Sequence, residues 1–288
     1  MGIVVPSWAA LSSRNIPDAL LGRYFGYCFA ASGALAVLTG TLGAWLVAKG
    51  GLQWGYATCC ASAFALQVFS IVLLAQTRPI GPAPAEPGRL LPFLRSRWKQ
   101  LFSDRTFQVF ALLVFCMQFA GGATQLFTTS LKDRGLPDSL FEWLNPAMAV
   151  GTMLGAFWLG HLFDRKGAWQ PWLIAFAALL LSLATLVWGG TGVASLALAY
   201  LGSGLFNVVY GVVNLPWILR LAGTAQAPVF MGLMNTLIAP WCFLAPYCLG
   251  KLARSHGVNS AFAVSALAAV ICIGLIYGSP RLHQKGNT

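Results

Sequence analysis

Residues 160–169, which read GHLFDRKGAW, bring three charges together between two long apolar runs. Asp164 precedes two basic residues, and Gly160 and Gly167 flank the charged group. An acid in this position can pair with donors on a neighbouring helix, or it can remain a solvated loop charge that adds almost nothing to stability. The choice depends on the solvent that surrounds the rest of the chain.

Polar side chains also recur at helical spacing within the apolar runs. Asn207, Tyr210, Asn214 and Trp217 follow one another at intervals of three, four and three residues, which predicts one face of a helix. Further amides within apolar runs are Gln118, Gln125 and Asn235. In hydrocarbon such groups need a partner or a wet face. The pattern therefore indicates either a cavity or hydrogen bonds between helices, which are worth about 0.6 kcal/mol each.

The composition is typical of a membrane protein. Of the 288 residues, 58% are hydrophobic and 9% are charged, and the mean hydropathy is +0.71. A soluble domain needs more charge than this to cover its surface, so the bilayer is the expected solvent. The net charge of +11 follows from the positive-inside rule and does not indicate a nucleic-acid partner. All seven cysteines lie in apolar runs without metal-binding spacing, so we expect no metal site, and nothing indicates a cofactor.

Eight apolar runs are long enough to span a bilayer as helices, which takes about 20 residues. We therefore predict an all-α, polytopic membrane protein with spans at residues 25–47, 52–76, 107–129, 142–163, 170–189, 193–219, 229–250 and 258–279. An even number of spans places both termini on one side. Of the 18 Lys and Arg residues, 13 fall on the side of the termini, so both termini are expected in the cytoplasm.

The charged stretch matches a known signature. Gly160, Asp164, Arg165 and Gly167 stand in the order G-x-x-x-D-[RK]-x-G, which resembles the signature of the major facilitator superfamily (MFS) of secondary transporters. In that family the signature lies between helices 2 and 3 and, in a weaker copy, between helices 8 and 9. The residues after Gly167 are not the usual basic ones, so this stretch resembles the weaker copy.

Two connecting stretches of the chain are similar to each other. PSWAALSSRNIPDALLGRYFG near the N-terminus and LPWILRLAGTAQAPVFMG after the sixth run share the order Pro, Trp, a basic residue, Pro, then an aromatic residue and Gly. Weak internal symmetry of this kind is expected of transporters that are built from repeats. The stretches would be the loops between helices 4 and 5 and between helices 10 and 11.

The resemblance implies an MFS-type helical bundle of which helices 5–12 of twelve are present. Residues 1–76 would be the remnant of the N-terminal half, with residues 1–11 as the end of helix 4. Residues 77–106 would be the cytoplasmic linker between helices 6 and 7. Residues 107–279 would form the six-helix C-terminal half, and residues 280–288 a cytoplasmic tail. The chain would then be incomplete at its N-terminus, and a partner chain could supply the missing helices.

The resemblance also implies secondary active transport of a small solute by alternating access, in the plasma membrane (the inner membrane of a bacterium). Asp164 would belong to the cytoplasmic gate and would face Arg23 and the amide groups that open a helix at residues 22–26. The polar residues named above would line the substrate cavity. Because no charged residue lies in the middle of a span, we expect a neutral or amphipathic solute.

Other classes of function are weaker expectations. A chain that lacks part of the fold could be a non-transporting remnant, or a scaffold or regulatory subunit in the membrane. A membrane-embedded enzyme is not expected, because His161, His256 and His283 are not paired with a carboxylate or thiol at a catalytic spacing.

Overall fold

The computed structural model describes residues 11–12, 15–76, 103, 105–137 and 139–279, and every regular element in these ranges is a helix. In chain order the elements are η1 (Asp18–Leu20), α2 (Leu21–Ala75), α4 (Arg105–Gly122), η2 (Ala123–Leu126), α5 (Phe127–Asp133), α6 (Ser139–Lys166), α7 (Trp169–Trp188), α8 (Val193–Asn207), the π-helical turn η3 (Tyr210–Asn214), α9 (Leu215–His256) and α10 (Val258–Tyr277).

The prediction of eight membrane-length helices is confirmed. The candidate spans are Asp18–Gly51, Gln53–Ala75, Arg105–Asp133, Leu144–Lys166, Trp169–Trp188, Val193–Leu221, Phe230–His256 and Val258–Tyr277. The first is longer than predicted at both ends, the seventh ends six residues later than predicted, and the others begin and end close to the predicted residues. Most of residues 1–11 and 77–106, and all of the predicted tail at residues 280–288, lie outside the described ranges.

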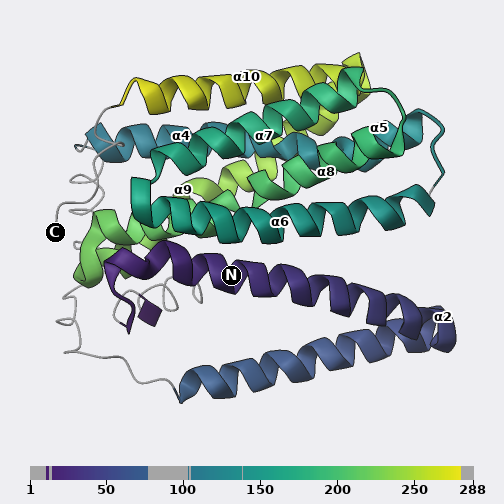
Figure 1. Ribbon diagram of the computed structural model, residues 1–288, viewed down its shortest axis with the longest axis horizontal. Helices are drawn as coiled ribbons and strands as arrows, with labels where there is room; N and C mark the ends of the chain where they lie inside the picture. The colour runs from purple at the N-terminus through teal and green to yellow at the C-terminus, as the bar shows by residue number, and fades with distance from the viewer. Residues whose placement is uncertain (1–10, 13–14, 77–102, 104, 138, 280–288) are drawn as a thin grey trace.

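Helix α2 consists of two antiparallel arms. Gly51 has φ 68° and ψ 174° and reverses the chain, a conformation that glycine adopts without strain. We call residues 21–50 the first arm and residues 52–75 the second arm. The two arms lie along one flank of the bundle, with the first arm next to α6 (Figure 1). None of the second arm's apolar window is buried, so the first arm alone carries the packing.

The remaining helices pack around an apolar core. Trp172 on α7 is its largest fully buried side chain, with ring centroids 6.0 Å from Phe110 and 5.8 Å from Trp217. Helices α6 and α8 approach so closely that a Cβ at Gly151 or Gly204 would overlap a backbone carbonyl of the other helix. Small residues at such crossings are the usual means of helix packing in membranes.

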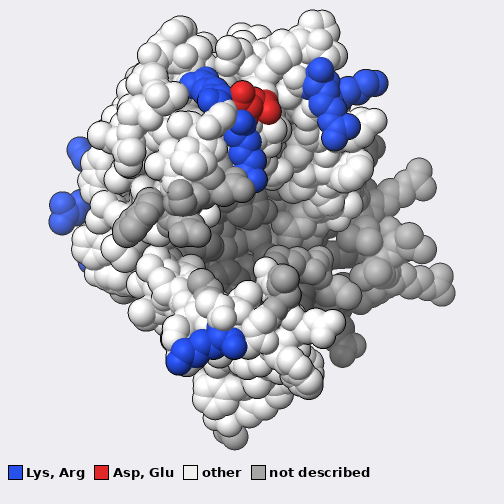
Figure 2. Space-filling model, turned by 90° about the vertical axis from the view of Figure 1, so that its right-hand side faces the viewer, with Lys and Arg blue, Asp and Glu red and all other residues white. Residues whose placement is uncertain are grey.

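The outer surface is largely apolar. Trp54, Phe64 and Trp188 are 76%, 72% and 82% exposed. Figure 2 shows the end of the bundle that lies away from the turn between α6 and α7, where most of the surface is uncharged and Lys and Arg are few. Apolar side chains on the outside of membrane-length helices are expected to contact lipid acyl chains.

The connection between the sixth and seventh spans differs from the prediction. The sequence predicts a loop between residues 219 and 229, but α9 remains helical through residues 222–229. Pro216 does not interrupt it, because it stands in the first turn of α9, where its missing N–H is not needed.

Candidate functional site

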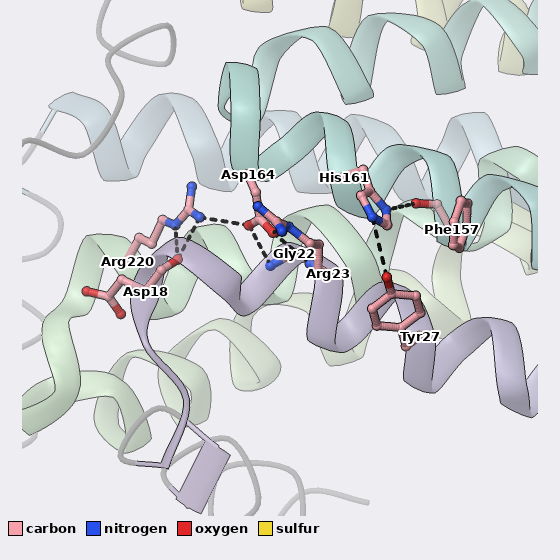
Figure 3. Close-up of polar contacts among 8 residues, drawn as sticks. All are labelled: Asp18, Gly22, Arg23, Tyr27, Phe157, His161, Asp164 and Arg220. Atoms are coloured by element: carbon pink, nitrogen blue, oxygen red, sulfur yellow. Dashed lines mark hydrogen bonds and ion pairs between the residues drawn. The ribbon is translucent and has the colours of Figure 1, made fainter.

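The Asp164 carboxylate caps the N-terminus of the first arm. Asp164 lies in the last turn of α6, and its two oxygens accept hydrogen bonds of 2.9 Å from the backbone N–H groups of Gly22 and Arg23 (Figure 3). These N–H groups belong to the first turn of α2, where a helix offers no internal acceptor and the N-cap residue makes no side-chain bond. The helix dipole also favours a carboxylate there, typically by about 0.3–1 kcal/mol.

Two arginine side chains complete the contact. Arg220 Nη2 donates to Asp164 Oδ1 at 3.0 Å, and Arg23 Nε lies 3.4 Å from Oδ2 as an ion pair without hydrogen-bond geometry. Arg220 also donates to the backbone carbonyl of Asp18 through Nε and Nη2, at 3.1 and 2.7 Å. The Asp164 side chain is only 1% exposed, so water screens these interactions little. One carboxylate therefore ties α6 to α2 and to α9.

The flanking glycines of the motif have separate structural reasons. Gly160 on α6 lies against Gly22 on α2. A Cβ at Gly22 would be 2.5 Å from the Gly160 carbonyl oxygen, so larger residues would keep the two helices further apart. Gly167 ends α6 with φ 80°, and its N–H donates to the carbonyl of Phe163 at 2.9 Å, a glycine C-cap. Arg165, by contrast, is exposed on the same turn.

A further polar contact joins α2 and α6 closer to the middle of the first arm. His161 Nδ1 lies 2.8 Å from the carbonyl oxygen of Phe157, which assigns the proton to Nδ1. Nε2 then accepts from the Tyr27 hydroxyl at a long 3.5 Å, and the Tyr27 ring lies edge-on to Phe157 with centroids 5.8 Å apart. This contact is weaker than the one at Asp164, and it aligns the same two helices (Figure 3).

A cavity of about 670 Å³ lies between α4 with η2, α8 with η3, and α9. Its volume is in the range of small-molecule sites, about 300–1,000 Å³. Of the seven residues predicted for a cavity, five line it: Gln118, Gln125, Asn207, Tyr210 and Asn235. Among the described residues that form its wall, none is Asp, Glu, Lys or Arg.

The Thr124 hydroxyl of the cavity wall donates to the carbonyl of Gly121 at 2.8 Å, but the polar side chains that reach across the wall are loosely paired. The Tyr210 hydroxyl donates to Asn235 Oδ1 at 3.3 Å, and the Cys242 thiol donates to Gln118 Oε1 at 3.5 Å. Asn207 Nδ2 lies 3.9 Å from a methionine sulfur. An O–H···O bond is usually about 2.7–2.8 Å long. The wall therefore keeps hydrogen-bonding capacity that a solute could use.

Two helices are irregular where they border the cavity. The chain tightens into the 3-10 turn η2 directly after Gly121 and Gly122. A Cβ at Gly121 would lie 2.9 Å from the Phe206 ring, so this glycine is needed for contact with α8. The π-helical turn η3 borders the cavity on the other side. Irregular turns inside helices are frequent at functional sites.

Asn214 and Trp217 do not line the cavity, so the prediction of one continuous polar face is wrong beyond Tyr210. The turn η3 adds a residue to the helix, which rotates all later residues by about 100° relative to an uninterrupted α-helix. Asn214 is 1% exposed and its Oδ1 accepts from Trp172 Nε1 at 2.6 Å, while the Trp217 ring lies 4.4 Å from that of Phe110. Both residues belong to the apolar core.

Sequence reasoning missed Arg220. The sequence feature that could have identified Arg220 is the similarity of the two connecting stretches, each of which carries a basic residue after a Trp. That similarity marks the position but does not show that Arg220 reaches Asp164. The corresponding Arg14 lies outside the described ranges.

A family model described as Major Facilitator Superfamily matches residues 1–246 of the chain. No curated protein matches the chain. The family match includes Asp164, all of its partners, and every residue that lines the cavity. Both parts of the candidate site therefore lie within the region that resembles the family.

Proposed function

Because the chain belongs to the major facilitator superfamily of membrane transporters, we propose that it moves a small, neutral or amphipathic solute across the membrane by alternating access. In this proposal residues 107–279 form the C-terminal half of the fold and residues 77–106 the linker that precedes it. The observation that carries the proposal is the Asp164 contact, because a single carboxylate holds three helices together at one end of a bundle that contains a cavity.

The Asp164 contact is suited to a gate because it can break without leaving a buried charge that has no partner. All of its donors come from α2 and α9, so it exists only while these helices lie against α6. Asp164 stands in the last turn of α6, where water replaces the lost donors once the helices part. Exchange of protein donors for water costs little net free energy, so the two states remain close in stability. The structure then corresponds to the state that is closed at this end.

The cavity wall supports an uncharged solute. Its amides and the Tyr210 hydroxyl offer donors and acceptors, whereas a charged solute would find no counter-charge on the described residues of the wall and would have a large desolvation cost. Phe206 adds an apolar surface for the body of the solute.

We place the Asp164 end at the cytoplasmic side of the plasma membrane, the inner membrane in a bacterium. The excess of Lys and Arg in the sequence on the side of the termini supports this orientation. The second arm of α2 buries none of its apolar window. A partner chain that binds this surface could supply the helices that face the cavity from the opposite side.

The test is uptake by the purified full chain in liposomes, with a panel of radiolabelled neutral solutes from sugars to nucleosides. We expect at least one solute to enter faster than into empty liposomes. Asp164→Asn should slow this uptake, and Arg165→Ala, an exposed residue on the same turn, should not. If a folded protein moves no solute of the panel, the non-transporting alternative is favoured.

A further inference from the structure

Phe29 and Gly211 form an apolar contact between the first arm of α2 and the turn η3. Phe29 is partly buried and packs against the core. A Cβ at Gly211 would lie on the Phe29 ring, 2.7 Å from Cε1 and closer still to Cε2 and Cζ. The ring can lie this close to the backbone of η3 only because position 211 has no side chain.

The contact lies at a level between the Asp164 carboxylate and the cavity. Phe29 follows Arg23 by six residues on the same helix, so it is about 9 Å further from the end of the bundle. Gly211 directly follows Tyr210, which lines the cavity. The Asp164 contact and the Phe29 contact are therefore arranged in series between the end of the bundle and the cavity.

The turn η3 also connects this contact to the cavity wall. Tyr210 and Gly211 are consecutive residues of the same turn. Tyr210 lines the cavity and donates to Asn235, whereas Gly211 faces Phe29. A solute that displaces the Tyr210 hydroxyl from Asn235 would therefore act on the same turn that seats the Phe29 ring.

We propose that Phe29, seated on Gly211, is a second closure between the Asp164 end and the cavity, and that it opens when the first arm leaves η3. The Phe29 side chain is an apolar ring that acts by its position. The inference rests on the proposed alternating access, but the closure can be measured without any solute.

Cys242 supplies a native reporter for this closure, because it is exposed and lines the cavity. The parent for the test carries Ser at the other four accessible or partly accessible cysteines, which are Cys28, Cys59, Cys60 and Cys248. The remaining Cys116 and Cys272 are buried. The rate at which a membrane-impermeant maleimide labels Cys242 is measured in inside-out and right-side-out vesicles.

We expect Phe29→Ala to shift the closed-to-open equilibrium about ten-fold toward the open state. The rate at which Cys242 is labelled from the Asp164 side should therefore rise about ten-fold. Gly211→Ala should act in the same direction, because its methyl group pushes the ring away. The double variant should label more slowly than either single one, since the methyl group then occupies part of the space that the ring has left. Phe29→Leu should stay near the parent.

The matched control is Phe64→Ala, which removes an aromatic ring from the exposed face of the second arm and should leave labelling unchanged. Unchanged labelling in both single variants, or a double variant that sums the two effects, overturns the inference. If Phe29→Ala does not fold, Phe29→Leu and Gly211→Ala decide the question. Loss of uptake with a normal labelling pattern would count against the proposed transport and not against the closure.

Discussion

The Asp164 contact and the cavity are both polar regions of an apolar bundle, but their groups are paired differently. At Asp164 the carboxylate accepts from two backbone N–H groups at 2.9 Å and from Arg220 at 3.0 Å, and it is almost fully buried. In the cavity the shortest described pair between two side chains of the wall, Tyr210 with Asn235, is 3.3 Å long, and Asn207 is exposed. Tight pairing holds helices in one arrangement, whereas loose pairing leaves room for a ligand.

This difference separates two kinds of sensitivity to mutation. Residues of the Asp164 contact and of the core should determine the stability of the closed state. Residues of the cavity should determine solute binding and leave stability nearly unchanged.

The largest effect is expected for Asp164→Ala. The change leaves two backbone N–H groups and Arg220 without their acceptor, and removal of one partner of a buried ion pair costs about 3–5 kcal/mol. We expect about 3 kcal/mol, because the Arg220 side chain is 18% exposed and can reach water. Thermal unfolding in detergent measures the loss. Arg165→Ala is the control, and an equal loss there would mean that Asp164 is only one charge among others.

The next effect is expected for Asn214→Ala, which removes the acceptor of the buried Trp172 N–H. An unsatisfied buried donor costs about 1–3 kcal/mol, so we expect a loss of about 2 kcal/mol in the free energy of unfolding. Uptake per folded molecule should remain unchanged, because Asn214 does not reach the cavity. If uptake falls while stability stays normal, Asn214 must contribute to the cavity wall.

The helices and the contact of Asp164 with the start of α2 were accessible from the sequence for identifiable reasons. Membrane spans need long apolar runs, so hydropathy locates all eight helices. The resemblance to a family with a known loop signature implied that Asp164 faces Arg23, and the structure brings these residues together. The role of this contact as a gate stays a prediction.

The sequence does not show which residues of the sixth span line the cavity, because a single added residue in the helix changes the direction in which all later side chains point. Periodicity assumes 3.6 residues per turn throughout, and η3 breaks that assumption between Tyr210 and Leu215. Only packing of the finished bundle stabilises such a turn, here with Gly211 against Phe29 and Asn214 against Trp172. Arg220 was missed for a similar reason, since its partner lies 56 residues away on another helix.

Asn207→Ala provides the matched comparison with Asn214→Ala, since both remove an Asn side chain close to η3. Asn207 is exposed in the cavity, and its Nδ2 makes a weak contact of 3.9 Å with a methionine sulfur. Stability should therefore change by less than about 0.5 kcal/mol. If the amide binds the solute by one hydrogen bond, the KM for uptake should rise about five- to ten-fold. A stability loss similar to that of Asn214→Ala would remove the distinction between the two regions.

The smallest effect is expected for Arg23→Ala, although Arg23 is part of the Asp164 contact. Its side chain is 43% exposed, and its Nε lies 3.4 Å from the carboxylate without hydrogen-bond geometry. The backbone N–H that Asp164 uses is still present in the variant, and exposed ion pairs contribute only about 0.2–1 kcal/mol. This small loss should disappear at about 1 M salt, where screening acts within about 3 Å, whereas the loss in Asp164→Ala should persist. If Arg23→Ala were as destabilising as Asp164→Ala, the carboxylate would be held by the side-chain charge, and helix capping could not be the reason why this contact is tight.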